Sequence, residues 1–399
     1  MLQRLRPTEL TVSRCSNLDG LNGLTSLKKL VIKDSDALQN LNGLKELTSL
    51  ETFTLGVSLG LKNVDGLKGL TGLKKLDLQV GVALPNVDVL KDLTGLQTLS
   101  FDACSALKSI DGLKNLTGLQ TLSLRNCNVL PNMDGLEKLT GLQTLAIRHC
   151  SSLKNLDSLK NLTGLQTLII EAGPSYNALQ NLDGLKGLTG LKNLHLSFCD
   201  ALKNVDLLKE LTGLQVLDFE YCHKLQNVDE LRGLTGLREL YLNSCNSLKN
   251  LDGLKGHTGL QVLKLYSCDA LPNVDDLRGL TGLRELYLRT GSKSQNVNEA
   301  LKGLTGMQRL HLNWCPSLSN LDALKGLTCL QELGLWKCSS LQNTDGLQGL
   351  TNLKTLTEPR ALRLSRRDDR ELLLAGRAIA TCQVWRGRAK GVNERRVYS

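Results

Sequence analysis

The stretch that decides the fold of this chain is Leu116-Thr117-Gly118-Leu119-Gln120-Thr121-Leu122-Ser123-Leu124-Arg125-Asn126-Cys127-Asn128-Val129-Leu130. Its threonine returns along almost the whole sequence, at Thr25, Thr48, Thr71, Thr94, Thr117, Thr140, Thr163, Thr189, Thr212, Thr235, Thr258, Thr281, Thr305, Thr328 and Thr351. Twelve of the fourteen intervals are 23 residues, one is 26 and one is 24. A fixed period in this range indicates a solenoid of stacked repeats, in which each unit contacts only its neighbours.

The first part of each unit has a period of two. Leu122 and Leu124 alternate with polar residues, which predicts a short, half-buried β-strand. Because the same strand recurs in every unit, we expect one parallel sheet with neighbouring strands about 4.8 Å apart. The leucines then point into the interior, and the alternate residues point to solvent.

The return part of each unit has a period of three. Its leucines recur at every third residue between Leu136 and Leu145, which suits a 3-10 turn because residues i and i+3 eclipse there. Thirteen of the fifteen units place Asp two residues before such a leucine, and we interpret this Asp as a cap whose side chain accepts a hydrogen bond from the turn. Short turns bend a solenoid less than α-helices, which pack about 8–10 Å apart. The expected shape is a shallow right-handed arc with the sheet on the concave face.

The pattern Leu119-x-x-Leu122-x-Leu124-x-x-Cys127-x-x-Leu130 resembles the conserved half of a leucine-rich repeat, over about residues 5–356. The unit, with its Asp-x-Leu-x-x-Leu return, is similar to internalin-type repeats and to the Cys-containing repeats of trypanosome expression-site proteins. The resemblance implies an α/β-type leucine-rich-repeat solenoid of about 15 units that acts as a protein–protein interaction scaffold. Internalin-like proteins usually carry a signal peptide and an N-terminal cap, which this sequence does not show.

Composition divides the chain into two regions. We expect residues 1–357 to form the solenoid, with a truncated first unit and extra residues near 173–177 and 297–300. Residues 358–399 contain eleven Lys and Arg against five Asp and Glu, and ten of the eleven are Arg. The interpretations of this second region are a mobile basic tail, a short cap over the last unit, or sequence foreign to the natural protein.

Ten of the twelve cysteines share one repeat position: Cys15, Cys104, Cys127, Cys150, Cys199, Cys222, Cys245, Cys268, Cys315 and Cys338. Ser or Gly fills this position in five other units, so disulfides are not required there. We expect a ladder of buried free thiols that donate weakly to carbonyls of the turns. An Asn five residues further on is expected to bond backbone groups of the next turn. Buried free thiols and the lack of an apolar signal segment favour a cytoplasmic protein, with surface or secreted locations open for a fragment.

No pattern in the sequence predicts catalysis, a cofactor or a metal. The histidines lie in separate units, Cys-x-x-Cys does not occur, and no glycine-rich loop has the spacing of a phosphate-binding site. His257 replaces a leucine and is expected at the edge of the core. No run of about 18 apolar residues predicts a membrane span. We therefore expect a monomeric, non-enzymatic protein.

The outward strand positions differ between units and are the candidates for partner contacts. They lie four, six, eight and nine residues after each threonine, and in the first half they are mostly small or polar. From Thr189 onward many hold aromatic or charged residues: His195, Phe198, Asp218, Glu220, Tyr221, Tyr241, Lys264, Tyr266, Tyr287, Arg289, His311, Trp314 and Trp336. Trp, Tyr and Arg are enriched among interface anchors, so the sequence predicts a protein partner on this concave half. The ordinary preference of strands for aromatic residues is the alternative explanation.

Two other functions remain open. The Arg-rich residues 358–399 are compatible with a nucleic-acid-associated protein, whose binding would depend steeply on salt. The Cys-containing unit is also shared by ubiquitin-ligase-type adaptors of the F-box kind, although their units are usually longer and follow an F-box that this sequence does not show.

Overall fold

We describe a computed structural model of the chain, in which residues 6–79, 84–173, 179–202, 205–289 and 297–357 are described. In these ranges sixteen strands form one sheet, and every strand pairs in parallel with the next along the chain. The strands are β1 (Glu9–Ser13), β2 (Lys29–Lys33), β3 (Thr52–Leu55), β4 (Lys75–Gln79), β5 (Thr98–Asp102), β6 (Thr121–Arg125), β7 (Thr144–Arg148), β8 (Thr167–Glu171), β9 (Asn193–Ser197), β10 (Val216–Asp218), β11 (Glu239–Tyr241), β12 (Val262–Leu265), β13 (Glu285–Leu288), β14 (Arg309–Leu312), β15 (Glu332–Gly334) and β16 (Thr355–Thr357). The expectations for residues 358–399 lie outside the described residues.

Helical turns connect the strands on the other side of each unit. The 3-10 turns are η1 (Asp19–Leu21), η2 (Asn42–Leu44), η3 (Asp65–Leu67), η4 (Asp88–Leu90), η5 (Asp111–Leu113), η6 (Asp134–Leu136), η7 (Asp157–Leu159), η8 (Asp183–Leu185), η9 (Asp206–Glu210), η10 (Asp229–Gly233), η11 (Asp252–Leu254), η12 (Asp275–Gly279), η13 (Asp322–Gly326) and η14 (Asp345–Leu347). A single α-helix among the described residues, α2 (Val297–Leu301), replaces one of them. It falls within the 24-residue interval between Thr281 and Thr305, close to the extra residue.

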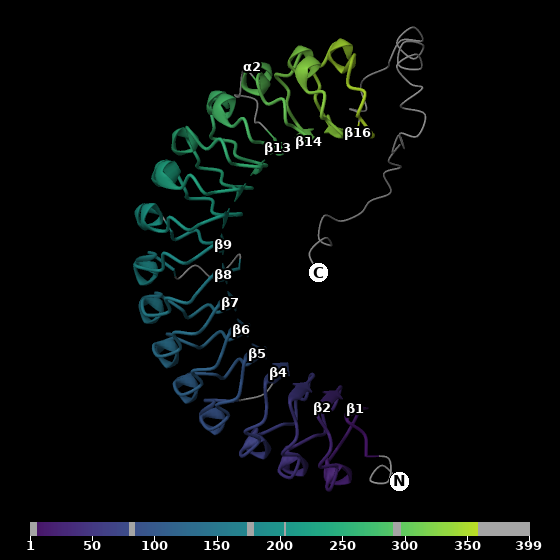
Figure 1. The fold of residues 1–399 in the computed structure, drawn as a ribbon, viewed down its shortest axis with the longest axis vertical. Coiled ribbons are helices and arrows are strands. Elements are labelled where there is room, and N and C mark those ends of the chain that lie inside the picture. The colour runs from purple at the N-terminus through teal and green to yellow at the C-terminus, as the bar shows by residue number, and fades with distance from the viewer. Residues whose placement is uncertain (1–5, 80–83, 174–178, 203–204, 290–296, 358–399) are drawn as a thin grey trace.

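The units stack into a C-shaped arc, with the sheet on its concave face and the turns on its convex face (Figure 1). The register places equivalent positions side by side, as in the pairing of Leu122 with Leu145. The sequence predicted a shallow arc, whereas the two ends of the arc in Figure 1 point to the same side. The turns are bulkier than extended strands, so they hold the units further apart on the convex side and bend the stack toward the sheet.

The leucines of successive units form one continuous apolar core from Leu18 to Leu353, as the periods of two and three predicted. Phe53 and Phe101 occupy leucine positions and are fully buried. His257 is also fully buried, so the expectation that it lies at the edge of the core was wrong. Its Nδ1 atom lies 3.1 Å from the Leu254 carbonyl oxygen, and this contact gives one ring nitrogen a polar partner inside the core.

The cysteine ladder has the predicted chemistry. All ladder cysteines are free, and each is buried except the half-buried Cys15 in the first unit. Cys222 donates to the Leu196 carbonyl of the preceding unit over 3.0 Å. Burial raises the pKa of Cys268 to about 12, which keeps this thiol protonated and able to donate.

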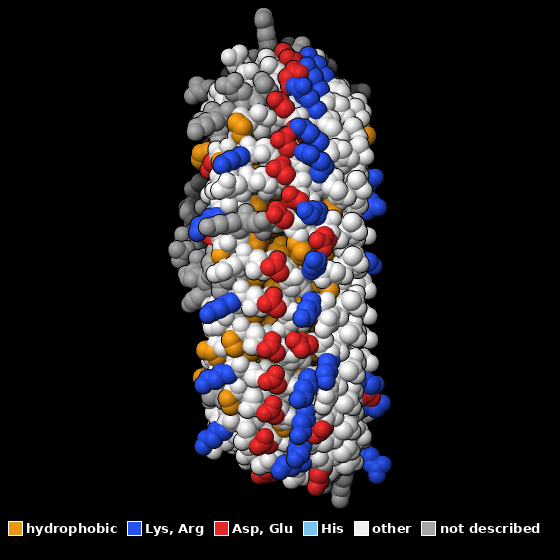
Figure 2. Space-filling model, turned by 90° about the vertical axis from the view of Figure 1, so that its left-hand side faces the viewer, with side chains coloured by type: hydrophobic (Ala, Val, Ile, Leu, Met, Phe, Trp, Pro, Cys, Tyr) orange, Lys and Arg blue, Asp and Glu red, His pale blue; other side chains and the backbone are white. Residues whose placement is uncertain are grey.

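The Asn ladder, with Ser109 in one unit, supplies the bond at the start of the turns for which the structure describes this residue, and the Asp ladder does not. Asn63 Oδ1 accepts a hydrogen bond from the Asp65 backbone N–H over 3.1 Å, and Ser109 does the same for Asp111 over 3.0 Å. The expected capping by Asp was wrong, because Asp is already the first residue of the turn and no side-chain cap bond forms there. The carboxylates instead face Lys and Arg, and Figure 2 shows the acidic and basic columns side by side on the convex face. Asp322 and Lys325 form one such pair at 2.8 Å.

The residue that follows the first Asp or Asn of each 3-10 turn affects how closely two neighbouring turns approach. A Cβ atom on Gly66 would lie 1.9 Å from the Leu41 carbonyl oxygen, and one on Gly253 would lie 1.8 Å from that of Val228. Only glycine therefore allows this close contact between turns. In the C-terminal half, the 3-10 turns that carry a larger residue in this position extend over five residues instead of three: η9, η10, η12 and η13.

Candidate functional site

All thirteen predicted partner-binding residues lie on the concave side, outside the core. Eleven are half-buried, and Trp314 and Trp336 are 37% and 39% exposed. Six lie within strands: His195, Asp218, Tyr241, Lys264, Tyr287 and His311. Seven lie just beyond the ends of strands: Phe198, Glu220, Tyr221, Tyr266, Arg289, Trp314 and Trp336. The prediction of a strand surface therefore holds for only half of the set.

The six strand residues form one row, which we call the middle row. They lie opposite one another on the successive strands β9 to β14. Lys264 Nζ lies 4.8 Å from the centre of the Tyr241 ring and 5.2 Å from that of Tyr287. The rings of Tyr287 and His311 stack with their centres 4.7 Å apart. The row thus presents cations and aromatic faces in contact, which stabilise each other electrostatically.

Carboxylates line the edge of this face where the strands begin. The Tyr241 hydroxyl donates to Glu239 over 2.6 Å, and Arg309 pairs with both Glu285 and Glu332. His311 Nε2 lies 3.1 Å from Glu332. Burial lowers the pKa of His311 below its ordinary value, although the Glu332 carboxylate opposes this shift. We call this the acidic edge, and its three glutamates all have partners.

Aromatic rings and cations, together with Glu220, line the opposite edge, where the strands end, and we call it the aromatic edge. The rings of Phe198 and Tyr221 stack at 4.4 Å, and those of Trp314 and Trp336 meet edge-to-face at 5.5 Å. Lys337 Nζ lies 3.7 Å from the Trp314 ring and 4.4 Å from that of Trp336. Lys337 lies nine residues after Thr328, in a position the sequence pattern marked, but it was not singled out.

Two asparagines that the sequence did not single out hold the aromatic edge in place. Asn243 Oδ1 accepts from the Tyr266 backbone N–H over 2.9 Å, and Asn313 Oδ1 accepts from that of Trp336 over 3.0 Å. Asn313 Nδ2 also donates to the Tyr266 hydroxyl over 3.3 Å. Each asparagine therefore ties one unit to the next where the strands end, which fixes the backbone beneath the rings.

The backbone at the aromatic edge is unusual for bulky residues. Phe198, Tyr221 and Trp314 have φ values of 60°, 62° and 53°, in the left-handed region. Side chains other than Gly, Asn and Asp are disfavoured there, and bulky ones most of all. In the N-terminal half the same position holds Arg14, Asp34, Ala103, Asn126 and His149, none of which is Phe, Tyr or Trp. Strand preference does not explain aromatic residues that lie beyond the strands.

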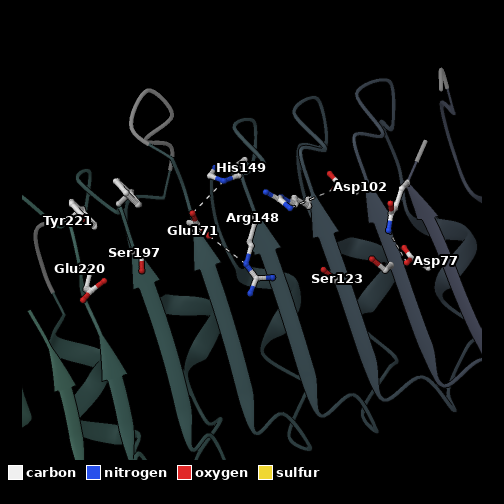
Figure 3. A pocket seen from close by; sticks show the side chains of 13 residues that line it. Asp77, Asp102, Ser123, Arg148, His149, Glu171, Ser197, Glu220 and Tyr221 are labelled. Carbon is white, nitrogen blue, oxygen red and sulfur yellow. Dashed lines mark hydrogen bonds and ion pairs between the residues drawn. The ribbon is translucent and has the colours of Figure 1, made fainter. Parts of the chain in front are cut away.

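A second feature, which sequence reasoning missed, is a hollow of about 720 Å³ over the ends of β4 to β10 (Figure 3). Small side chains such as Ser123 line it, and charged groups stand around them. Arg148 lies 3.6 Å from Glu171, and His149 lies 3.4 Å from the same carboxylate. No sequence pattern marks this hollow, because Ser and Thr on a strand also fit a plain solvated surface.

Neither metal binding nor membrane insertion has support in the described ranges. No group of three or more His, Cys, Asp and Glu residues within them could hold a metal ion. No helix within those ranges is long and apolar enough to span a bilayer.

Family models agree with this architecture. A model of leucine-rich repeats in two copies matches residues 212–256, and a model of the BspA-type leucine-rich repeat region in six copies matches residues 80–172. The chain contains leucine-rich repeats. No curated protein matches it. Leucine-rich repeats commonly mediate protein–protein interactions, and proteins built from them are typically not enzymes.

Solved structures share the leucine-rich repeat fold with this chain. An internalin of Listeria monocytogenes aligns with a TM-score of 0.60 and 22% identity, over 79% of this chain and 82% of its own. A leucine-rich repeat protein of Leptospira interrogans aligns with a TM-score of 0.64 and 19% identity, over 91% and 90%. TLR13, in a complex with ssRNA13, aligns with a TM-score of 0.56 and 19% identity, over 84% and 61%. The repeats resemble those of internalins in fold.

Proposed function

We propose that this leucine-rich repeat protein is a non-catalytic scaffold that binds a protein partner on the concave face of its C-terminal half. The observation that carries the proposal is the placement of Phe198, Tyr221 and Trp314 in left-handed backbone beyond the strand ends. That backbone favours small residues, and three units nevertheless hold an aromatic one. A contact outside the solenoid explains these rings better than the needs of the fold.

Exposure of the tryptophans supports the same surface. Only five large hydrophobic side chains are exposed among the described residues: Val57, Leu59, Val129, Trp314 and Trp336. Two of the five are the neighbouring tryptophans of the aromatic edge. Tryptophan is among the residues that most often dominate binding energy, with losses of about 2 kcal/mol or more on truncation. We therefore expect Trp314 and Trp336 to be the main anchors.

The test compares two double variants of the full chain. Trp314→Ala with Trp336→Ala removes the anchors, whereas Val57→Ala with Leu59→Ala removes exposed apolar surface elsewhere. We expect the first to lose a captured partner, with affinity falling about 100-fold or more, and the second to retain it. Thermal unfolding of both variants confirms that the solenoid remains folded. A partner held equally well by the tryptophan variant would contradict the proposal.

The alternative is binding of nucleic acid through residues 358–399, which is favoured by the excess of Arg in that region. Removal of these residues distinguishes the two proposals: capture that survives the deletion contradicts the alternative, and capture that is lost with it and falls steeply with salt supports it. An adaptor role in ubiquitin ligation would use the same concave face. We place the protein in the cytoplasm, because its free thiols suit a reducing compartment.

A further inference from the structure

A small hollow of about 310 Å³ lies at the aromatic edge, between the two pairs of rings. Tyr221 closes one side, and Trp314 and Trp336 close the other. Ser244 and Ser267 line the space between them and leave it open, since both are small. This volume is at the lower limit of ligand pockets, which span roughly 300–1,000 Å³. It therefore suits one or two side chains of a bound segment better than a whole cofactor.

Two cations of this edge have no acidic partner. Arg289 lies 4.9 Å from the Trp314 ring, and Lys337 lies over both tryptophans. Neither forms an ion pair with any carboxylate of the described residues, whereas Arg309 on the acidic edge pairs with two glutamates. Arg289 lines the hollow, and Lys337 lies next to it over the two tryptophans that close it. Both positive charges are thus held by aromatic rings and remain available to a carboxylate from outside.

Tyr266 supplies a third donor to the same hollow. Its hydroxyl oxygen accepts a hydrogen bond from Asn313, so its own proton is free to point elsewhere. Burial raises the pKa of Tyr266 to about 12, and the group stays neutral and able to donate at physiological pH. Two donors, Arg289 and Tyr266, therefore line a space bounded by aromatic rings, and a third, Lys337, lies next to it.

We propose that this hollow binds an acidic segment of the partner protein, in which an Asp or Glu side chain lies next to an apolar one. The inference rests on the proposed function and adds the chemistry of the partner. The carboxylate contacts Arg289, Lys337 and Tyr266, and the apolar side chain packs on the exposed parts of Trp314 and Trp336. Because the opposite edge of the face is lined with glutamates, the acidic residue of the segment is directed to the aromatic edge.

The experiment selects peptides from a display library of random sequences with the full chain. The first variant is Arg289→Glu with Lys337→Glu, which reverses both cations. Its matched control, Lys160→Glu with Lys186→Glu, makes the same change of net charge at exposed positions beside the convex turns η7 and η8. The third variant is the tryptophan pair replaced by Ala. Circular dichroism establishes that each variant is folded before the selection.

The unchanged chain and the convex control should enrich Asp or Glu beside an apolar residue, and the reversed variant should enrich Lys or Arg instead. A selected peptide should bind the reversed variant about tenfold more weakly or worse. Peptides lost with the tryptophans but unaffected by charge reversal would overturn this inference and leave the proposed function standing. Peptides unaffected by either change would overturn both, and a selection without enrichment would overturn the inference alone.

Discussion

Strands β6 and β11 lie in different halves of the arc and differ on only one of their faces. Leu122 and Leu240 occupy the same interior position, and both are fully buried. Their outward neighbours are Ser123 in the N-terminal half and Tyr241 in the C-terminal half. Packing in a close-packed interior tolerates little change of volume, whereas the outward position is free to differ. The two halves of the molecule therefore differ mainly in the outward side chains that they present to a partner.

The convex side differs between the halves in a related way. Glycine follows the first residue of most turns in the N-terminal half. In the C-terminal half it does so in η11 and η14, whereas Leu207, Glu230, Asp276 and Ala323 take its place in the other 3-10 turns. At Gly66 and Gly253 glycine lets consecutive turns touch through their backbones, since a Cβ atom there would collide with the preceding turn. Turns with and without glycine in this position thus keep the same strand register, and the five-residue turns with a larger residue occur only in the C-terminal half of the described chain.

The largest expected effect comes from placing the same side chain in the two kinds of turn. Gly66→Val puts a Cβ atom at 1.9 Å from the Leu41 carbonyl oxygen, which forces the backbone to move. We expect a loss of about 3 kcal/mol in the free energy of unfolding, measured by urea denaturation. Glu230→Val, in a turn that already carries a side chain, should change it by less than about 0.5 kcal/mol. Equal losses for the two would remove the distinction between the two kinds of turn.

A smaller effect is expected where the halves differ at the left-handed residue. Asn126 has φ of 55°, and its side chain donates to Asp102 over 2.9 Å. Asn126→Trp should cost about 1–2 kcal/mol of stability, because a bulky residue is strained in this backbone. Trp314→Asn should change stability by less than about 1 kcal/mol, since relief of strain offsets the lost ring contacts. Thermal unfolding measures both, and a large loss for Trp314→Asn would show that this ring serves the fold.

Periodicity predicted the interior well because packing repeats with the sequence. The alternation around Leu122 predicted the strand, the burial of its leucines and the in-register parallel sheet. The shared cysteine position predicted free, buried thiols, and these are present. In each case one physical requirement, a dry interior shared by neighbours, acts identically in every unit.

Other features depend on contacts between units that a pattern within one unit does not contain. The capping role was assigned to Asp65 when it belongs to Asn63, because sequence spacing did not fix the first residue of the turn. His257 was placed at the edge of the core, although its contact with a carbonyl allows full burial. The hollow over β4 to β10 arises from curvature and small side chains together. The left-handed backbone of Trp314 could not be predicted from the residue type, since aromatic residues rarely adopt this conformation.

The smallest expected effect concerns the titration of His311 in the middle row. In the N-terminal half, the equivalent position on β6 holds Ser123, which does not titrate. Burial lowers the pKa of His311, so the folded chain binds a proton less readily than the unfolded chain. Stability is therefore complete above the ordinary histidine pKa of about 6.5 and declines as the pH falls below it. His311→Gln, which cannot titrate, should lose less stability than the unchanged chain between neutral and mildly acidic pH. Urea denaturation at the two pH values measures the difference, and parallel losses in the two proteins would show that His311 does not contribute.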